Sequence, residues 1–217
     1  LLGFALPYLF GNTITVSVVL GTMMAVIIVV LSLYELHQRA THRHGFVQGI
    51  FKLSRSHWGM VLAHLGVAMT VFGIAFSQNF SIERDVRMKV GDSAQILDYQ
   101  FTFKGIRDSN GANYVGGTAV IEIQRDGKYE ATLLAEKRFY TVSKMGMTEA
   151  AIDWGFSRDL YAALGERLED GSWGLRLYYK PFIRWIWLGG LFMAIGGILC
   201  LLDRRYRLKI AVKEKLA

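Results

Sequence analysis

Residues 58–76 read WGMVLAHLGVAMTVFGIAF, an almost wholly apolar run that contains one ionisable side chain, His64. A helix of roughly 18 to 20 apolar residues spans the hydrocarbon core of a bilayer. An ionisable side chain at that depth is costly, so it marks a candidate functional site. Neutral imidazole is also a common nitrogen ligand of haem iron. The stretch therefore predicts a transmembrane helix whose function centres on His64.

Two further apolar blocks have the composition of transmembrane helices. They are VSVVLGTMMAVIIVVLSL at 16–33 and FIRWIWLGGLFMAIGGILCLL at 182–202. Lys and Arg gather between the first two spans and after the third, and basic segments of this kind stay in the cytoplasm. The long segment between the second and third spans is therefore expected on the opposite face. Arg184 departs from this pattern, but near a helix end its long side chain can snorkel to the interface.

These observations predict a membrane protein with three transmembrane α-helices and an all-β domain shaped like a small barrel or sandwich. The first residue is Leu and no basic region precedes the first apolar run, so we expect part of a longer polypeptide without a signal peptide. The expected segments are the end of a preceding segment at 1–10, a first transmembrane helix at 11–35, a cytoplasmic loop at 36–56, a second helix with His64 at 57–77, the β-domain at 78–181, a third helix at 182–202 and a cytoplasmic basic tail at 203–217.

The β-domain is predicted from residues that alternate between apolar and polar. The alternating runs at 98–105, 118–124 and 129–134 are separated by turn residues, and Asp126-Gly127 and Asp170-Gly171 are hairpin signals. The domain contains no His, and the only cysteine of the chain is Cys200, in the third span. An internal disulfide, thiol chemistry and a soft metal site are therefore excluded from it. We expect it to bind or dock a partner.

The net charge of +7 comes partly from the basic segments that flank the spans. Orientation in the membrane and contact with lipid headgroups account for these charges. No stretch resembles a nucleic-acid-binding module, so no nucleic-acid partner is expected.

The second span has two distinct faces. Glycines recur every seven residues at 59, 66 and 73, so they line a stripe along which a neighbouring helix can approach closely. His57 and His64 are also seven apart, about 200° away from the glycines at 100° per residue. The small residues Ala63 and Thr70 are expected to flank His64 and leave room for a bulky group.

His57 and His64 cannot be the two axial ligands of one haem. They are about 10.5 Å apart along the helix axis, whereas nitrogens on opposite sides of an iron are only about 4 Å apart. A second ligand must come from another helix; Met23, Met24 or Met193 could serve, although apolar packing is the more common role of methionine. A headgroup contact is the expected role of His57, with haem binding as a weaker alternative. A hydrogen bond between helices is the alternative for His64.

Several long runs resemble the C-terminal part of the CcmF family of cytochrome c biogenesis proteins. They are SRSHWGMVLAHLGVAMTVFGIAFS at 54–77, SIERDVRMKVGD at 81–92, TEAAID at 148–153, SRDLYAALGE at 157–166 and LRLYYKPFIRWIW at 175–187. The resemblance covers essentially the whole chain. A paralogue that serves cytochrome c nitrite reductase shares these features.

The resemblance implies a haem lyase subunit of System I in the bacterial cell inner membrane, with the β-domain in the periplasm. Such proteins take substrate haem from a haem chaperone and help attach it to the Cys-x-x-Cys-His motif of apocytochrome c, together with thiol-handling subunits. They also hold a b haem in the membrane, thought to be reduced by quinol, and His64 matches one of its axial ligands. The matching region implies that the missing N-terminal part carries the tryptophan-rich segment, the two outer histidines and the second ligand.

Two other functions remain open at this point. A b-type quinol-linked electron-transfer subunit would need a second membrane histidine. A non-catalytic, membrane-tethered chaperone or scaffold for cytochrome assembly would use His64 only for packing.

Overall fold

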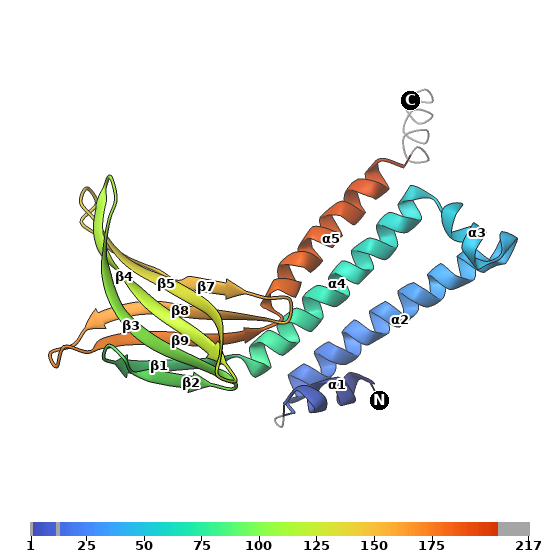
Figure 1. Ribbon diagram of the computed structural model, residues 1–217. Coiled ribbons are helices and arrows are strands. Elements are labelled where there is room, and N and C mark those ends of the chain that lie inside the picture. Colours follow the sequence, from blue (N-terminus) through green and yellow to red (C-terminus); the bar gives the residue numbers. More distant parts are fainter. Residues whose placement is uncertain (1, 12–13, 204–217) are drawn as a thin grey trace. The chain divides into compact units, whose positions relative to one another are not determined.

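The computed structural model describes residues 2–11 and 14–203, apart from the side chains of residues 42–44. The chain divides into a helical unit, residues up to 79 and from 182, and a unit of strands, residues 80–181 (Figure 1). Within the described residues, three helices are long and apolar enough to cross a membrane. The predicted fold class, three apolar helices with a β-sandwich-like domain, is therefore confirmed.

The helical unit contains five helices in its described part: α1 (Leu2–Phe10), α2 (Val16–His44), α3 (Phe46–Phe51), α4 (Arg55–Phe80) and α5 (Ile183–Leu201). The long apolar helices are α2, α4 and α5. α2 continues well beyond its apolar stretch, and an ion pair one turn apart, Arg39 to Glu35 at 2.8 Å, supports these polar turns. The segment expected as a loop at 36–56 therefore contains the last turns of α2 and the short helix α3.

Glycines bring α4 and α5 into close contact. A Cβ atom placed on Gly66 would stand 2.6 Å from the carbonyl oxygen of Gly189, and one on Gly196 would stand 2.5 Å from that of Gly59. Only glycine allows two helix backbones to approach this closely. The neighbouring Gly197 has nothing within 4 Å of such an atom. The glycine stripe predicted for the second span is confirmed as a tight packing face.

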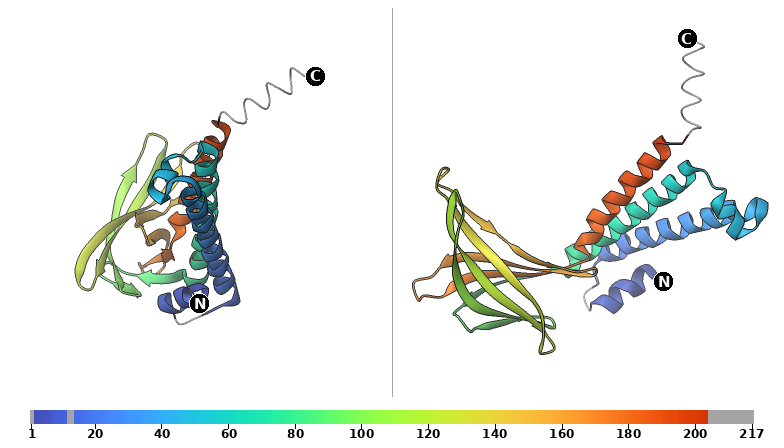
Figure 2. Two further views of the ribbon diagram at one scale, coloured as in Figure 1. Left: turned by 90° about the vertical axis from the view of Figure 1, so that its right-hand side faces the viewer. Right: turned by 45° about the horizontal axis from the view of Figure 1, so that its top comes forward.

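Polar contacts fix the two ends of α4 within the helical unit. At its N-terminal end, the backbone N–H of Ser56 donates to Asp203 Oδ2 at 2.9 Å. At its C-terminal end, the Ser17 hydroxyl of α2 donates to Asn79 Oδ1 at 3.1 Å. One turn before Asn79, the Cβ of Ala75 would stand 2.6 Å from a Cβ placed on Gly21 of α2. α4 thus packs against α2 as well as α5, which fixes the helix that carries His64 (Figure 2).

The β-domain consists of two antiparallel sheets, in the orders β1-β9-β8-β7 and β2-β3-β4-β5-β6 (Figure 1). The strands are β1 (Ile82–Met88), β2 (Ser93–Ile96), β3 (Tyr99–Asn110), β4 (Tyr114–Arg125), β5 (Lys128–Tyr140), β6 (Gly146–Glu149), β7 (Ala151–Trp154), β8 (Arg158–Arg167) and β9 (Trp173–Pro181). Only Ala150 separates β6 from β7, so the chain changes sheet within one residue. Side chains from both sheets, including Phe101, Phe103, Ile121 and Leu177, form one buried core.

The predicted hairpins have the expected turn chemistry. Asp126 and Gly127 both have positive φ, 50° and 73°, as a two-residue turn between β4 and β5 requires. Gly171 has φ 79° between β8 and β9. Both predicted turns are confirmed. The strands β1, β2, β6 and β7 were not predicted from the sequence pattern.

Candidate functional site in the second membrane span

His64 lies near the middle of α4, on a part of the helix that is exposed within this chain. Val67 and Ile74, at helical spacing from it, are 36% and 40% exposed. The glycines on the other side of α4 are buried against α5. His64 and the glycines therefore lie on different sides of α4, and the His64 side chain is exposed within this chain.

One hydrogen bond defines the chemistry of this imidazole. His64 Nδ1 lies 2.8 Å from the carbonyl oxygen of Met60, one turn earlier in α4. A carbonyl oxygen can only accept, so Nδ1 carries the proton and Nε2 keeps its lone pair. Metal-binding histidines are commonly oriented in this way, by a backbone carbonyl that holds the other ring nitrogen. The residue therefore fits an axial haem ligand that binds through Nε2.

The small residues expected beside His64 point elsewhere. A Cβ on Gly196 would stand 3.0 Å from the Cβ of Ala63, and the Thr70 hydroxyl donates to the Ile186 carbonyl at 3.4 Å. Both residues therefore pack against α5. The prediction that they leave room beside His64 is wrong, because both lie within about 60° of the glycine stripe when counted at 100° per residue.

His57 also differs from its expected role. It is only 7% exposed, and its Nε2 has no hydrogen-bond partner among the described residues. This burial contradicts the expected headgroup contact. Haem binding by His57 was the weaker alternative, and it stays a prediction that no observation tests.

A second axial ligand is not evident among the described side chains. Met193 packs against Gly66, on the face opposite His64, while Met23 and Met24 of α2 are about half exposed. The ring of His37 lies 5.3 Å from that of Phe46. No group of three or more His, Cys, Asp or Glu residues that could hold a metal ion occurs in the described part of the chain.

The β-domain has a charged groove of about 630 Å³, lined mainly by β1, β8 and β9 of the four-stranded sheet and also by Lys137 and Thr148 of the other sheet. Its charged side chains pair with one another: Arg176 Nε donates to Asp85 at 2.6 Å, and Lys137 pairs with Glu166. The hydrogen bond to Asp85 raises the pKa of the Arg176 guanidinium. Charged side chains of both signs line this groove, and its lining contains no His and no Cys.

Comparison with known proteins identifies the family. The profile described as the CcmF C-terminal beta-sandwich matches residues 79–181. A cytochrome c-type biogenesis protein CcmF from Haemophilus influenzae is 71% identical over 98% of this chain, and one from Escherichia coli is 54% identical over 98%. The chain belongs to the CcmF family. It spans about a third of the length of these curated relatives, 33% and 32%.

A solved CcmF structure has the same fold. The chain named Cytochrome c Heme Lyase CcmF aligns with a TM-score of 0.70 at 20% identity, covering 93% of this chain and 33% of that one. The resemblance to the CcmF family predicted from the sequence is thus confirmed. Together with the three apolar helices, it establishes a membrane protein of the cytochrome c biogenesis family.

Proposed function

We propose that this chain forms the C-terminal portion of a CcmF-type haem lyase, which acts in the maturation of c-type cytochromes, and that His64 is one axial ligand of a b haem within the membrane. The observation that carries the proposal is the His64 imidazole, held by Met60 with its Nε2 lone pair on an exposed part of α4. A haem bound there would supply a one-electron redox centre inside the bilayer.

The surrounding residues give His64 a fixed position. The Met60 carbonyl keeps the proton on Nδ1 and sets the plane of the ring. On the other side of α4, the contact of Gly66 with Gly189 leaves no space for the helix to shift towards α5. The second ligand is expected from the part of the CcmF polypeptide that lies outside this chain, since the relatives are about three times as long.

The remaining parts of the proposal concern location and partners. The helices lie in the bacterial inner membrane with the β-domain in the periplasm. Apocytochrome c, the haem chaperone and the thiol-handling subunits of System I are the partners, and quinol is the electron donor. Support comes from the cytochrome c biogenesis function that the names of the relatives state.

Truncation of His64 in the full-length protein tests the proposal. His64→Ala should reduce the b haem of the purified protein to background, measured as the pyridine haemochrome, and cellular c-type cytochromes should fall with it. Val67→Ala, one turn further along the exposed face, is the matched control and should leave both unchanged. His64→Gly should regain its reduced b-type spectrum when free imidazole is added, because imidazole can occupy the space of the missing side chain.

Each rival function has its own outcome. Normal b haem in His64→Ala would remove His64 as the ligand. Loss of b haem with normal cytochrome c maturation would favour the b-type electron-transfer subunit. A wild-type protein without b-type bands would favour the non-catalytic chaperone or scaffold.

A further inference from the structure

One end of the β-domain collects large apolar side chains on its surface. Trp154 and Phe156, at the β7–β8 turn, are 71% and 74% exposed, and Tyr129 at the start of β5 is 65% exposed. Leu97, in the β2–β3 turn, is 52% exposed. Exposed apolar groups that gather at one place on a protein mark a contact with another apolar surface.

The three turns that carry these side chains lie together. Arg158, the first residue of β8, donates to the Tyr99 hydroxyl at 3.1 Å and to Glu130 at 2.6 Å. Tyr99 follows the β2–β3 turn, and Glu130 follows the β4–β5 turn. The β2–β3, β4–β5 and β7–β8 turns are therefore neighbours at one end of the sandwich, which we call the aromatic end.

The chain enters and leaves the domain at this same end. Ile82 is paired with Tyr179 across β1 and β9, and Arg158 is paired with Pro181 across β8 and β9. A single residue separates β1 from α4, and another separates β9 from α5. Two Cα steps reach at most about 7 Å. The aromatic end is therefore the end of the domain at which the chain continues directly into two helices that can cross a membrane.

The β7–β8 turn extends past the last residue of β9. Arg158 is paired with Pro181, so Phe156 belongs to the turn that lies beyond this pair. We propose that this turn inserts into the headgroup region of the outer leaflet, with Trp154 and Phe156 as anchors. Tryptophan and tyrosine concentrate in this layer because their rings are apolar and their edges are polar. Lys128 and Lys180, at the same end, suit anionic lipid phosphates.

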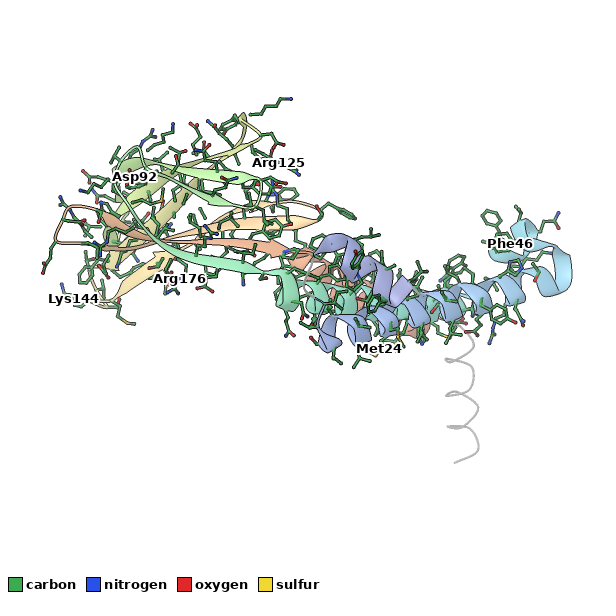
Figure 3. All side chains as sticks on the ribbon, turned by 90° about the horizontal axis from the view of Figure 1, so that it is seen from below. Met24, Phe46, Asp92, Arg125, Lys144 and Arg176 are labelled. Atoms are coloured by element: carbon green, nitrogen blue, oxygen red, sulfur yellow. The ribbon has the colours of Figure 1, made fainter. Side chains whose placement is uncertain are left out.

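The opposite end of the sandwich offers an internal contrast. Val142 and Met145, in the β5–β6 turn, are 87% and 63% exposed. They lie at the other end of β5, a strand of 13 residues that is about 40 Å long. Figure 3 shows Arg125 and Lys144 at opposite ends of the domain. Arg125 lies next to the β4–β5 turn of the aromatic end, and Lys144 lies in the β5–β6 turn. Apolar side chains are similarly exposed at both ends of the domain. Only at the aromatic end does the chain continue into the apolar helices α4 and α5.

Nitroxide accessibility can measure insertion directly. Cys200 is the only cysteine, so Cys200→Ser provides a background for single labels at Phe156→Cys or, as the matched control, Val142→Cys. The intact chain is reconstituted in vesicles of phosphatidylethanolamine and phosphatidylglycerol. Collisions with oxygen, which concentrates in lipid, are compared with collisions with a water-soluble nickel chelate.

We expect the label at 156 to collide several-fold more often with oxygen than with the chelate, and the label at 142 to show the reverse. Adding Trp154→Ser to the Phe156→Cys chain should move the label at 156 towards water. Three results would overturn the proposal: a label at 156 as accessible to the chelate as the one at 142, a label at 156 shielded from both reagents by protein, or lipid exposure at both sites.

Discussion

The helical unit and the β-domain differ in what they bury. The share of residues buried within this chain is 22%, 39% and 11% in the apolar stretches of α2, α4 and α5. In the β-domain, by contrast, side chains such as Phe101, Phe103 and Leu177 are 0% exposed and form one continuous core. The helices α4 and α5 touch through glycines such as Gly66 and Gly189 and through ring contacts such as that of Phe72 with Trp185.

This difference shows which part of the molecule is complete by itself. A sandwich that closes its own core gains stability from apolar area removed from water. A helix whose large side chains face outward buries little apolar area against the rest of this chain, so packing within the chain does little to stabilise it. Such a helix is stable where lipid or further protein surrounds it. The exposed His64 belongs to that second kind of surface.

The largest expected effect comes from removing a core side chain of the β-domain. Leu133 is 2% exposed and the adjacent Leu134 is 53% exposed. Leu133→Ala should lower the free energy of unfolding of the domain by about 2–5 kcal/mol, because a cavity remains, whereas Leu134→Ala should change it by less than about 0.5 kcal/mol. Denaturant titration of the chain in micelles, followed by the sheet band of the infrared spectrum, measures both. Equal effects from the two variants would contradict the assignment of the core.

A smaller effect is expected from the helix contact. Gly196→Ala should weaken the packing of α5 on α4 by about 1–3 kcal/mol, because the added methyl meets the backbone of Gly59, which cannot rotate away. Gly197→Ala should be neutral or slightly stabilising, since nothing lies within 4 Å. Titration of the micellar chain with a denaturing detergent, followed by a fluorophore pair on α4 and α5, reports the separation of the helices. If Gly197→Ala were the more damaging variant, the contact face would be misassigned.

Periodicity predicted the large elements of both units well. The apolar blocks gave the three long helices, and Asp126-Gly127 gave a hairpin because only a few residues tolerate positive φ at both turn positions. β1 was missed because its sequence, IERDVRM, does not alternate. As an edge strand it has a neighbour, β9, on one side only, and its burial is correspondingly low.

The candidate site was predicted in part. The sequence singled out His64, since one imidazole in a long apolar run stands out. It could not give every neighbour of α4, and so the burial of His57 was not foreseen. The packing of Thr70 against α5 agrees with its angle from the glycine stripe, which the prediction overlooked. Angular position on a helix shows which residues share a face, but the face that meets a neighbour depends on tertiary contacts. The sequence did not mark Trp154 and Phe156 as part of a binding surface, because single exposed aromatic residues are common in strands and turns.

The smallest expected effect is an acid sensitivity confined to the β-domain. Hydrogen bonds from the hydroxyl and the backbone N–H of Ser172 lower the pKa of Asp170 in the β8–β9 turn. A carboxyl whose pKa is lower in the folded state stabilises that state above its unfolded pKa of about 3.9, and the contribution is lost as the pH falls through the folded pKa. Wild type should therefore be the more stable chain at neutral pH, and the stabilities of wild type and Asp170→Asn should converge as the pH falls below about 3.9 through the lowered pKa.

Denaturation midpoints of the sheet band at several pH values measure this convergence. The denaturation midpoint of the helices should not change with the Asp170→Asn substitution at any pH, because Asp170 lies in the other unit. A gap between the two chains that stays constant down to low pH would assign the effect of the substitution to altered turn geometry. A matching loss in the helices would show that the two units unfold together, and the contrast between a self-contained sandwich and an incomplete helical unit would then fail.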